Sequence, residues 1–120
     1  GLTRPWNDPH ADLARAMATA ASGVLIAERA GVPVGSVMYG VDGHRGWIYY
    51  LAVAPEARRG GLGRMLMHAA ERRLRALGAP KLQLMVREGN DAALAFYARL
   101  GLERQPVVTL GRFLREDDAT

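Results

Sequence analysis

The chain has 120 residues, 49% of them hydrophobic, which is enough apolar material for a single buried core. It contains no cysteine, and its three histidines are too far apart for a zinc motif of the HExxH type, so we expect no metal. No apolar run approaches the roughly 20 residues of a membrane span, and the start lacks a signal-peptide pattern. These observations predict one cytoplasmic domain over residues 1–120 with no membrane partner.

The formal net charge is +4, and all basic residues except Lys81 are arginines, which suit bidentate binding of phosphate or carboxylate. This composition leaves nucleic-acid binding open as a hypothesis. However, the charge is moderate, and no aromatic residues are interleaved with the arginines as a single-strand groove requires. We therefore expect no nucleic-acid partner.

The first half of the chain predicts a helix followed by antiparallel strands. Asp8 and Pro9 begin a helical pattern over residues 9–21, and two strand-like runs, 24–29 and 32–41, surround a short glycine turn. The run 47–53 is apolar or aromatic on both faces, as in a central strand that is covered on both sides.

The second half predicts a helix over residues 62–77, a strand over 81–86, a helix that begins at Asn90 and ends before Gly101, and a last strand within 106–114. This order is typical of a mixed α/β sheet, antiparallel in its N-terminal half and then parallel after a helical crossover.

A glycine-rich loop with the spacing Arg58-x-x-Gly61-x-Gly63 joins the central strand to the helix 62–77. Free N–H groups and the helix dipole favour an anion at such a helix start. The spacing matches neither GxxxxGK[ST] nor GxGxxG. A plain glycine turn with solvated arginines therefore remains the alternative.

Two segments resemble the signatures of one family. LAVAPEARRGGLGRMLM, residues 51–67, resembles the coenzyme-A-binding motif Q/R-x-x-G-x-G/A of the GNAT N-acetyltransferases, and GNDAALAFYARLGL, residues 89–102, resembles their second signature. RPWNDP and DGHRGWIYYLAV further resemble a small bacterial YpeA-like branch. The resemblance implies a splayed parallel pair of central strands and helices on both faces of the sheet. Because family members usually begin with a further strand and helix, we also expect an N-terminally truncated domain.

The resemblance implies that acetyl-coenzyme A is the co-substrate. Its pyrophosphate is expected on the backbone N–H groups of residues 59–64, and its pantetheine beside residues 51–53, where a backbone N–H can polarise the thioester carbonyl. The expected cofactor-binding residues are Leu51, Ala52, Val53, Arg58, Arg59, Gly60, Gly61, Leu62, Gly63, Arg64 and Asn90. For Asn90, helix capping alone is the alternative.

By the same resemblance, Tyr97 is the expected proton donor to the departing thiolate, and core packing is its alternative role. Tyr49, Tyr50 and Met85 stand where some relatives carry a glutamate base, so the base stays unassigned. The loop candidates for it are Asp42, His44 and Glu88, and the candidates for lining the acceptor pocket are Trp6, Trp47 and Tyr50.

The resemblance therefore implies an enzyme of the acyltransferase class that acetylates a primary amine by direct attack on the thioester. The acceptor is a small molecule or a protein N-terminus, and a homodimer is a possible assembly. The alternative is a non-catalytic acyl-coenzyme-A-binding or interaction protein on the same fold. The sequence does not choose the acceptor.

Overall fold

The computed structural model describes residues 21–58 and 60–114. These residues fall into two compact units, 21–85 and 86–114, and each is described by itself. The helix predicted over residues 9–21 lies outside the described residues, except that Ala21 is in a turn.

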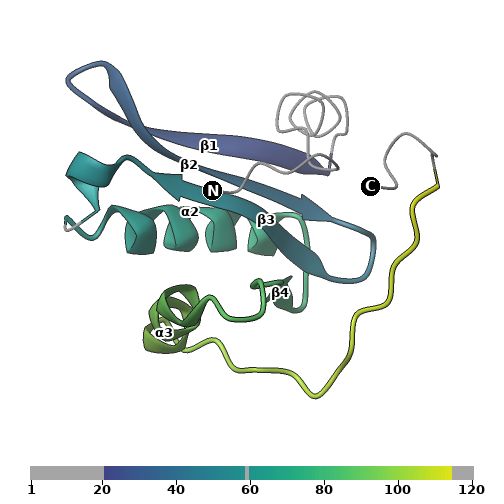
Figure 1. Cartoon of the computed structure of the whole chain (residues 1–120). Coiled ribbons are helices and arrows are strands. Elements are labelled where there is room, and N and C mark those ends of the chain that lie inside the picture. The colour runs from purple at the N-terminus through teal and green to yellow at the C-terminus, as the bar shows by residue number, and fades with distance from the viewer. Residues whose placement is uncertain (1–20, 59, 115–120) are drawn as a thin grey trace. The chain divides into compact units, whose positions relative to one another are not determined.

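The larger unit contains a four-stranded sheet, a short 3-10 helix and one long helix (Figure 1). The strand order is β1-β2-β3-β4, with both pairs among β1, β2 and β3 antiparallel and the pair β3-β4 parallel. This arrangement confirms the predicted mixed sheet. The elements are β1 (Ser22–Arg29), β2 (Val32–Val41), β3 (Gly46–Val53), η1 (Pro55–Ala57), α2 (Leu62–Ala76) and β4 (Leu82–Leu84).

The β1-β2 hairpin turns over only two residues, Ala30 and Gly31, between the paired residues Arg29 and Val32. Both turn residues have positive φ, 52° and 80°, which is the pattern of a type I′ turn. Glycine adopts this conformation freely, whereas the Cβ of alanine disfavours it. The hairpin predicted from the sequence is therefore confirmed.

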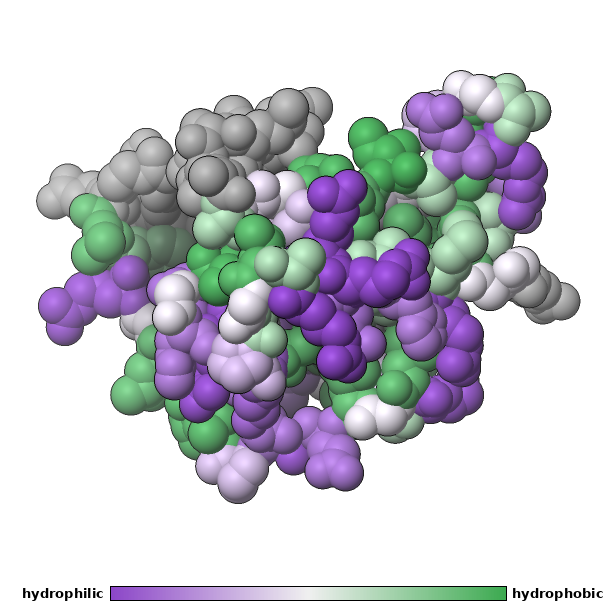
Figure 2. Space-filling model, turned by 180° about the vertical axis from the view of Figure 1, so that it is seen from behind, coloured by the Kyte–Doolittle hydropathy of each residue, from purple (hydrophilic) through white to green (hydrophobic). Residues whose placement is uncertain are grey.

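Helix α2 packs on one face of the sheet through its apolar stripe. Its buried residues are Leu62, Leu66, Met67, Ala70 and Leu74. Leu77, the last residue of the predicted helix range, is the C-cap and is 44% exposed. The opposite face of the helix carries most of its arginines. The molecular surface seen from behind shows many hydrophilic side chains beside apolar ones (Figure 2).

Two strand glycines let α2 approach the sheet closely. A Cβ atom built on Gly35 would lie 2.9 Å from Cδ1 of Leu66, and one built on Gly46 would lie 3.0 Å from Cδ1 of Leu74. Real Cβ atoms rarely tolerate such distances, so larger residues at either strand position would push the helix outward.

The turn between β2 and β3 is organised by one carboxylate. The Asp42 side chain accepts hydrogen bonds from the backbone N–H groups of His44 (2.8 Å) and Arg45 (2.7 Å) and from the indole Nε1 of Trp47 (2.9 Å). These three donors, with the Arg45 N–H the strongest, lower the pKa of Asp42 from 3.8 to about 2. Asp42 therefore fixes both the turn and the first aromatic side chain of β3.

The smaller unit contains one helix, α3 (Asp91–Arg99), which confirms the helix predicted after Asn90. The residue after its C-cap, Gly101, has a φ of 88°, as a glycine at a helix end commonly does.

The strand predicted within residues 106–114 is wrong, because the structure assigns no strand there. The segment has the residue types of a strand, yet Val108, Leu110 and Leu114 are between 85% and 93% exposed. Residue preference alone does not form a strand, since a strand also needs a neighbouring backbone to pair with. Strand β4 is likewise shorter than its predicted range 81–86.

Replacing Ala30 with Asn should increase the free energy of unfolding by about 0.5–1 kcal/mol, because Asn tolerates positive φ better than Ala. Urea unfolding at unchanged m-value measures this difference. Ala30→Val is the matched control and should destabilise the protein, since a β-branched residue is poorly accommodated at this φ. A lower stability for Ala30→Asn would contradict the turn assignment.

The Asp42 carboxyl carbon should titrate near pH 2 in an NMR experiment, and Trp47→Phe should move its pKa upward by removing one donor. Because the folded-state pKa lies below the unfolded value, the contribution of Asp42 to stability is present above about pH 4 and is lost as the pH falls through about 2. Asp42→Asn should remove this pH dependence. A wild-type midpoint near 3.8 would contradict the hydrogen-bond assignment.

Candidate functional site

The sheet opens between its two parallel strands. Their ladder ends at the pair Ile48 and Leu84, whereas β3 continues to Val53 (Figure 1). The register with β2 shifts at the same place, because Met38 pairs with Tyr50 and the next β2 residue pairs with Ile48. Tyr49 is therefore an extra residue in β3, and such a bulge bends its strand and increases the local twist. The second half of β3 thus has no β4 partner along one edge.

The backbone groups at this free edge follow from the alternation of a strand. Ala54 donates its N–H to the carbonyl of Val34 in β2 at 2.8 Å, so Ala52, two residues earlier, also faces β2. Leu51 and Val53 consequently direct their N–H and C=O groups away from β2. Of the predicted segment 51–53, these two residues present backbone polar groups to the opening, and Ala52 does not.

The glycine-rich loop begins where β3 ends. The short helix η1 is closed by Arg58, whose Nε donates to the carbonyl of Val53 at 3.3 Å, and Gly60 donates its N–H to the carbonyl of Ala57 at 3.3 Å. Gly61 is the N-cap of α2 with φ 74°, and a Cβ built there would meet nothing within 4 Å. The requirement for glycine at residue 61 is therefore conformational rather than steric. Arg59 lies outside the described residues.

At the start of α2, three backbone N–H groups have no hydrogen-bond acceptor among the described residues. Met65 is the first residue whose N–H bonds back along the chain, to the carbonyl of Gly61 at 3.1 Å. Among the described residues, the N–H groups of Leu62, Gly63 and Arg64 have no acceptor, no side chain caps the helix, and its first turn holds no acidic residue. Together with the positive end of the helix dipole, these donors form the kind of site that binds an anion.

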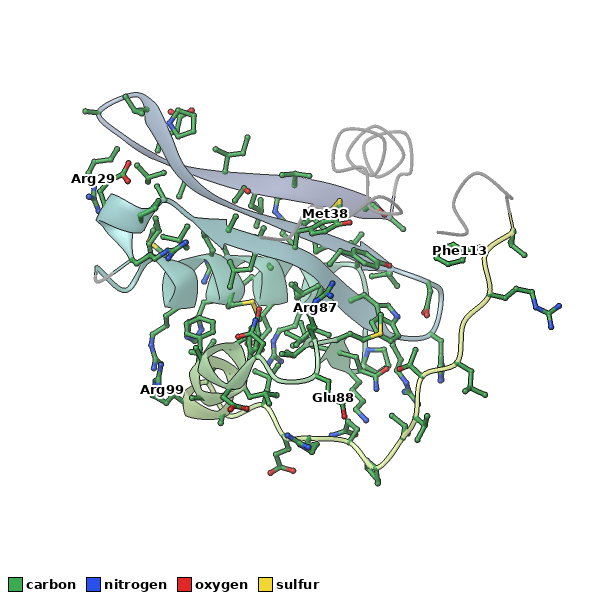
Figure 3. All side chains as sticks on the ribbon, in the orientation of Figure 1. Arg29, Met38, Arg87, Glu88, Arg99 and Phe113 are labelled. Carbon is green, nitrogen blue, oxygen red and sulfur yellow. The ribbon has the colours of Figure 1, made fainter. Side chains whose placement is uncertain are left out.

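The sequence analysis did not predict one cationic side chain near this loop, that of Arg29. Arg29, the last residue of β1, is labelled in Figure 3 beside η1. A Cβ built on Gly60 would lie 3.6 Å from its Nη2 atom. Arg29 is 31 positions before Gly60 in the chain, and only the hairpin brings the two together, so no local motif signals this contact.

Asn90 and Tyr97 belong to the smaller unit. The side-chain oxygen of Asn90 accepts a hydrogen bond from the N–H of Ala93 at 3.1 Å, so its capping role is confirmed. Tyr97 is half-buried and packs edge-to-face against Phe96, with ring centroids 5.1 Å apart. Burial raises the pKa of Tyr97 above its ordinary value of 10.0, so the phenol stays protonated at neutral pH.

The candidates for a general base differ in their surroundings. Asp42 is a poor base because three hydrogen bonds hold its pKa near 2. Burial, and then the negative charge of Asp42, raise the pKa of Tyr49, so this phenol does not serve as a base near neutrality. His44 and Glu88 are both exposed. Among the residues of ranges 21–58 and 60–114, no group of three His, Asp or Glu side chains is placed to hold a metal, and no helix is long and apolar enough to span a membrane.

The fold is similar to that of several solved structures, all less than 25% identical in sequence. A structure of AAC(6')-Iy with the bisubstrate analogue CoA-S-monomethyl-acetylneamine matches 87% of this chain and 77% of its own length, at 20% identity and a TM-score of 0.76. The aminoglycoside acetyltransferase meta-AAC0020 from an uncultured soil metagenomic sample, in complex with trehalose, matches 91% and 76%, at 24% identity and a TM-score of 0.72. A transcriptional regulator from Bacillus halodurans C-125 matches 87% and 74%, at 20% identity and a TM-score of 0.74.

A family model covers most of the chain. The model described as the acetyltransferase (GNAT) family matches residues 2–102, a range that includes the opened edge of β3, the glycine-rich loop and the helix with Tyr97. The protein therefore belongs to the GNAT family of acetyltransferases.

Proposed function

We propose that the protein is an N-acetyltransferase that moves the acetyl group of acetyl-coenzyme A to a primary amine. The observation that carries this proposal is the succession of a free strand edge, a glycine-rich loop and an uncapped helix start within one compact unit. An extended amide-containing chain fits the strand edge, and a phosphate group fits the helix start. Acetyl-coenzyme A contains both parts in one molecule.

The phosphate-binding part is assigned to the loop and the first turn of α2. The backbone N–H groups of Leu62, Gly63 and Arg64 donate to the pyrophosphate, and the positive φ of Gly61 turns the chain into the helix. Arg58, whose Nε is held by the Val53 carbonyl, and Arg64, which is exposed, add positive charge. Arg59, Gly60 and Gly61 complete the binding residues expected from the family motif.

The pantetheine part is assigned to the second half of β3. Leu51 offers its backbone N–H and C=O toward the opening and Val53 offers its N–H, while the Val53 carbonyl accepts a hydrogen bond from Arg58. An extended pantetheine can therefore pair with this edge as a further strand would. The donor closest to the bulge, the N–H of Leu51, is the candidate for polarising the thioester carbonyl as negative charge develops on its oxygen. Ala52 lies between Leu51 and Val53 and, because its backbone groups face β2, makes no backbone hydrogen bond to the pantetheine.

The proton for the thiolate leaving group is assigned to Tyr97. In the reaction the amine nitrogen bonds to the thioester carbon, the carbon-sulfur bond breaks, and the sulfur takes up a proton while the nitrogen loses one. A phenol whose pKa is raised by burial is protonated over the whole neutral range and therefore available as the donor. Asn90 is proposed as a pantetheine contact in addition to its capping role.

The acceptor substrate is assigned only by its chemical class. We propose a small-molecule primary amine as the acceptor class, with a protein N-terminus as the alternative. The homodimer, the cytoplasmic location and membership of the YpeA-like branch remain predictions from the sequence. Two of the similar proteins, AAC(6')-Iy and meta-AAC0020, are aminoglycoside acetyltransferases by name, but likeness at this identity supports the fold and does not transfer a substrate. The proton acceptor for the amine stays unassigned.

The second candidate function is a non-catalytic acyl-coenzyme-A-binding protein. It is favoured by the lack of a carboxylate at Tyr49, Tyr50 and Met85 and by the engagement of Asp42 in its turn. Both candidates require the same phosphate and pantetheine contacts, so binding alone does not separate them. Turnover of acetyl-coenzyme A with an amine acceptor does.

Calorimetric titration should show that the protein binds acetyl-coenzyme A and not dephosphorylated pantetheine. Gly61→Val should weaken this binding by about tenfold or more, because a β-branched residue does not readily adopt the φ of 74° that aligns the helix N–H groups. Gly43→Val is the matched control, since Gly43 has φ 91° and open space but lies in the β2-β3 turn. Equal weakening in both variants would count against the phosphate site.

Tyr97→Phe should lower kcat by about 10²-fold or more and leave acetyl-coenzyme A affinity nearly unchanged, because only proton donation is removed. Thiol release with an amine acceptor measures kcat, and calorimetry measures affinity. The alkaline decrease of wild-type kcat that reflects Tyr97 should lie above pH 10, since burial raises this pKa. An unchanged kcat in Tyr97→Phe would support a packing role instead.

A further inference from the structure

Arg29 occupies a position that the hairpin holds firmly. It is the last residue of β1 and pairs with Val32, and the two residues between them form the tight turn described above. The backbone of Arg29 is therefore tied into the sheet on one side of a two-residue connection. Its side chain is exposed.

The guanidinium of Arg29 lies close to the glycine-rich loop. Its Nη2 atom is 3.6 Å from the position that a Cβ on Gly60 would occupy, so a side chain at residue 60 would come into contact with it. Gly60 comes two residues before Leu62, the first residue of α2. The labelled view shows Arg29 beside η1, the short helix that precedes this loop (Figure 3).

The positive charge of the Arg29 guanidinium is not neutralised by any side chain in the described part of the chain. There, the Arg29 side chain has neither an ion pair nor a hydrogen bond, although Glu28 and Glu56 are both exposed and close in sequence to the two sides of the contact. A guanidinium beside the positive end of a helix dipole is a repulsive arrangement by itself. A bound anion would reverse the sign of that interaction and use the guanidinium as a bidentate donor.

We propose that Arg29 binds a phosphate group of coenzyme A at the outer side of the glycine-rich loop. The inference rests on the proposed function, and it adds a residue from the β1-β2 hairpin to a site otherwise built from β3, the loop and α2. Coenzyme A carries phosphate at two positions, the pyrophosphate and the 3′-phosphate. They share the chemistry that an arginine recognises, so ligands that differ in the 3′-phosphate distinguish them.

The test is calorimetric titration of the full chain with coenzyme A and with dephospho-coenzyme A, which lacks the 3′-phosphate. Arg29→Gln should weaken coenzyme A binding by about tenfold, as expected for one exposed charge-assisted contact, and Arg29→Lys by a smaller factor. Arg72→Ala is the control, because Arg72 is exposed on α2 and its removal changes the net charge equally. This control should stay within about twofold of wild type.

Comparison of the two ligands then assigns the contact. If Arg29→Gln weakens only coenzyme A binding, Arg29 contacts the 3′-phosphate; if it weakens both ligands equally, Arg29 contacts the pyrophosphate. The salt dependence of affinity should also decrease in Arg29→Gln and not in Arg72→Ala.

Unchanged affinity in Arg29→Gln, with wild type binding coenzyme A, would overturn the role of Arg29 and leave the proposed function intact. Equal weakening in Arg29→Gln and Arg72→Ala would also overturn it, because net charge would then explain the effect. A wild-type protein that binds neither ligand would overturn both proposals. Circular dichroism on each variant verifies that the compared proteins are folded.

Discussion

The close packing of α2 on the sheet is the constraint on which the candidate site depends. Glycines at positions 35 and 46 bring the helix to the strands without intervening side chains, and Leu66 and Leu74 fill the remaining space. Because the helix is held along its length, its N-terminus is fixed beside the end of β3. The free N–H groups of its first turn therefore point from a rigid support, which reduces the entropic cost of binding an anion there.

The opened edge of β3 depends on a second local feature, the extra residue Tyr49. The bulge coincides with the end of the parallel ladder, so the strand leaves β4 while it remains paired with β2. In the turn before β3, the Asp42 carboxylate holds the indole of Trp47 through a hydrogen bond. The bulge thus determines which backbone groups of the following residues face the opening. Asp42, a residue type suited to general-base chemistry, instead accepts hydrogen bonds that stabilise the turn.

The larger unit contains the parts expected to hold acetyl-coenzyme A, and the smaller unit contains the proposed proton donor. This division separates two kinds of chemistry. In the proposed function, binding relies on backbone groups and on exposed arginines, which act through conformation and charge. The proposed proton donor is one side chain, Tyr97, whose burial keeps it in the protonated form. The acceptor does not follow from family membership, because one fold can carry sites for many different substrates.

The sequence by itself determined the features that depend on local patterns. The hairpin, the central strand, the helix that starts at Leu62 and the cap at Asn90 all follow from hydrophobic periodicity and from residues suited to turns and caps. Only the tertiary structure decided what depends on pairing between distant segments. It left residues 106–114 without a strand assignment, since residue preference supplies no partner; it showed that Leu51 and Val53 rather than Ala52 face the opening; and it brought Arg29 to Gly60. Strand register and contacts across a hairpin arise from the packing of the whole sheet, so no short stretch of sequence contains them.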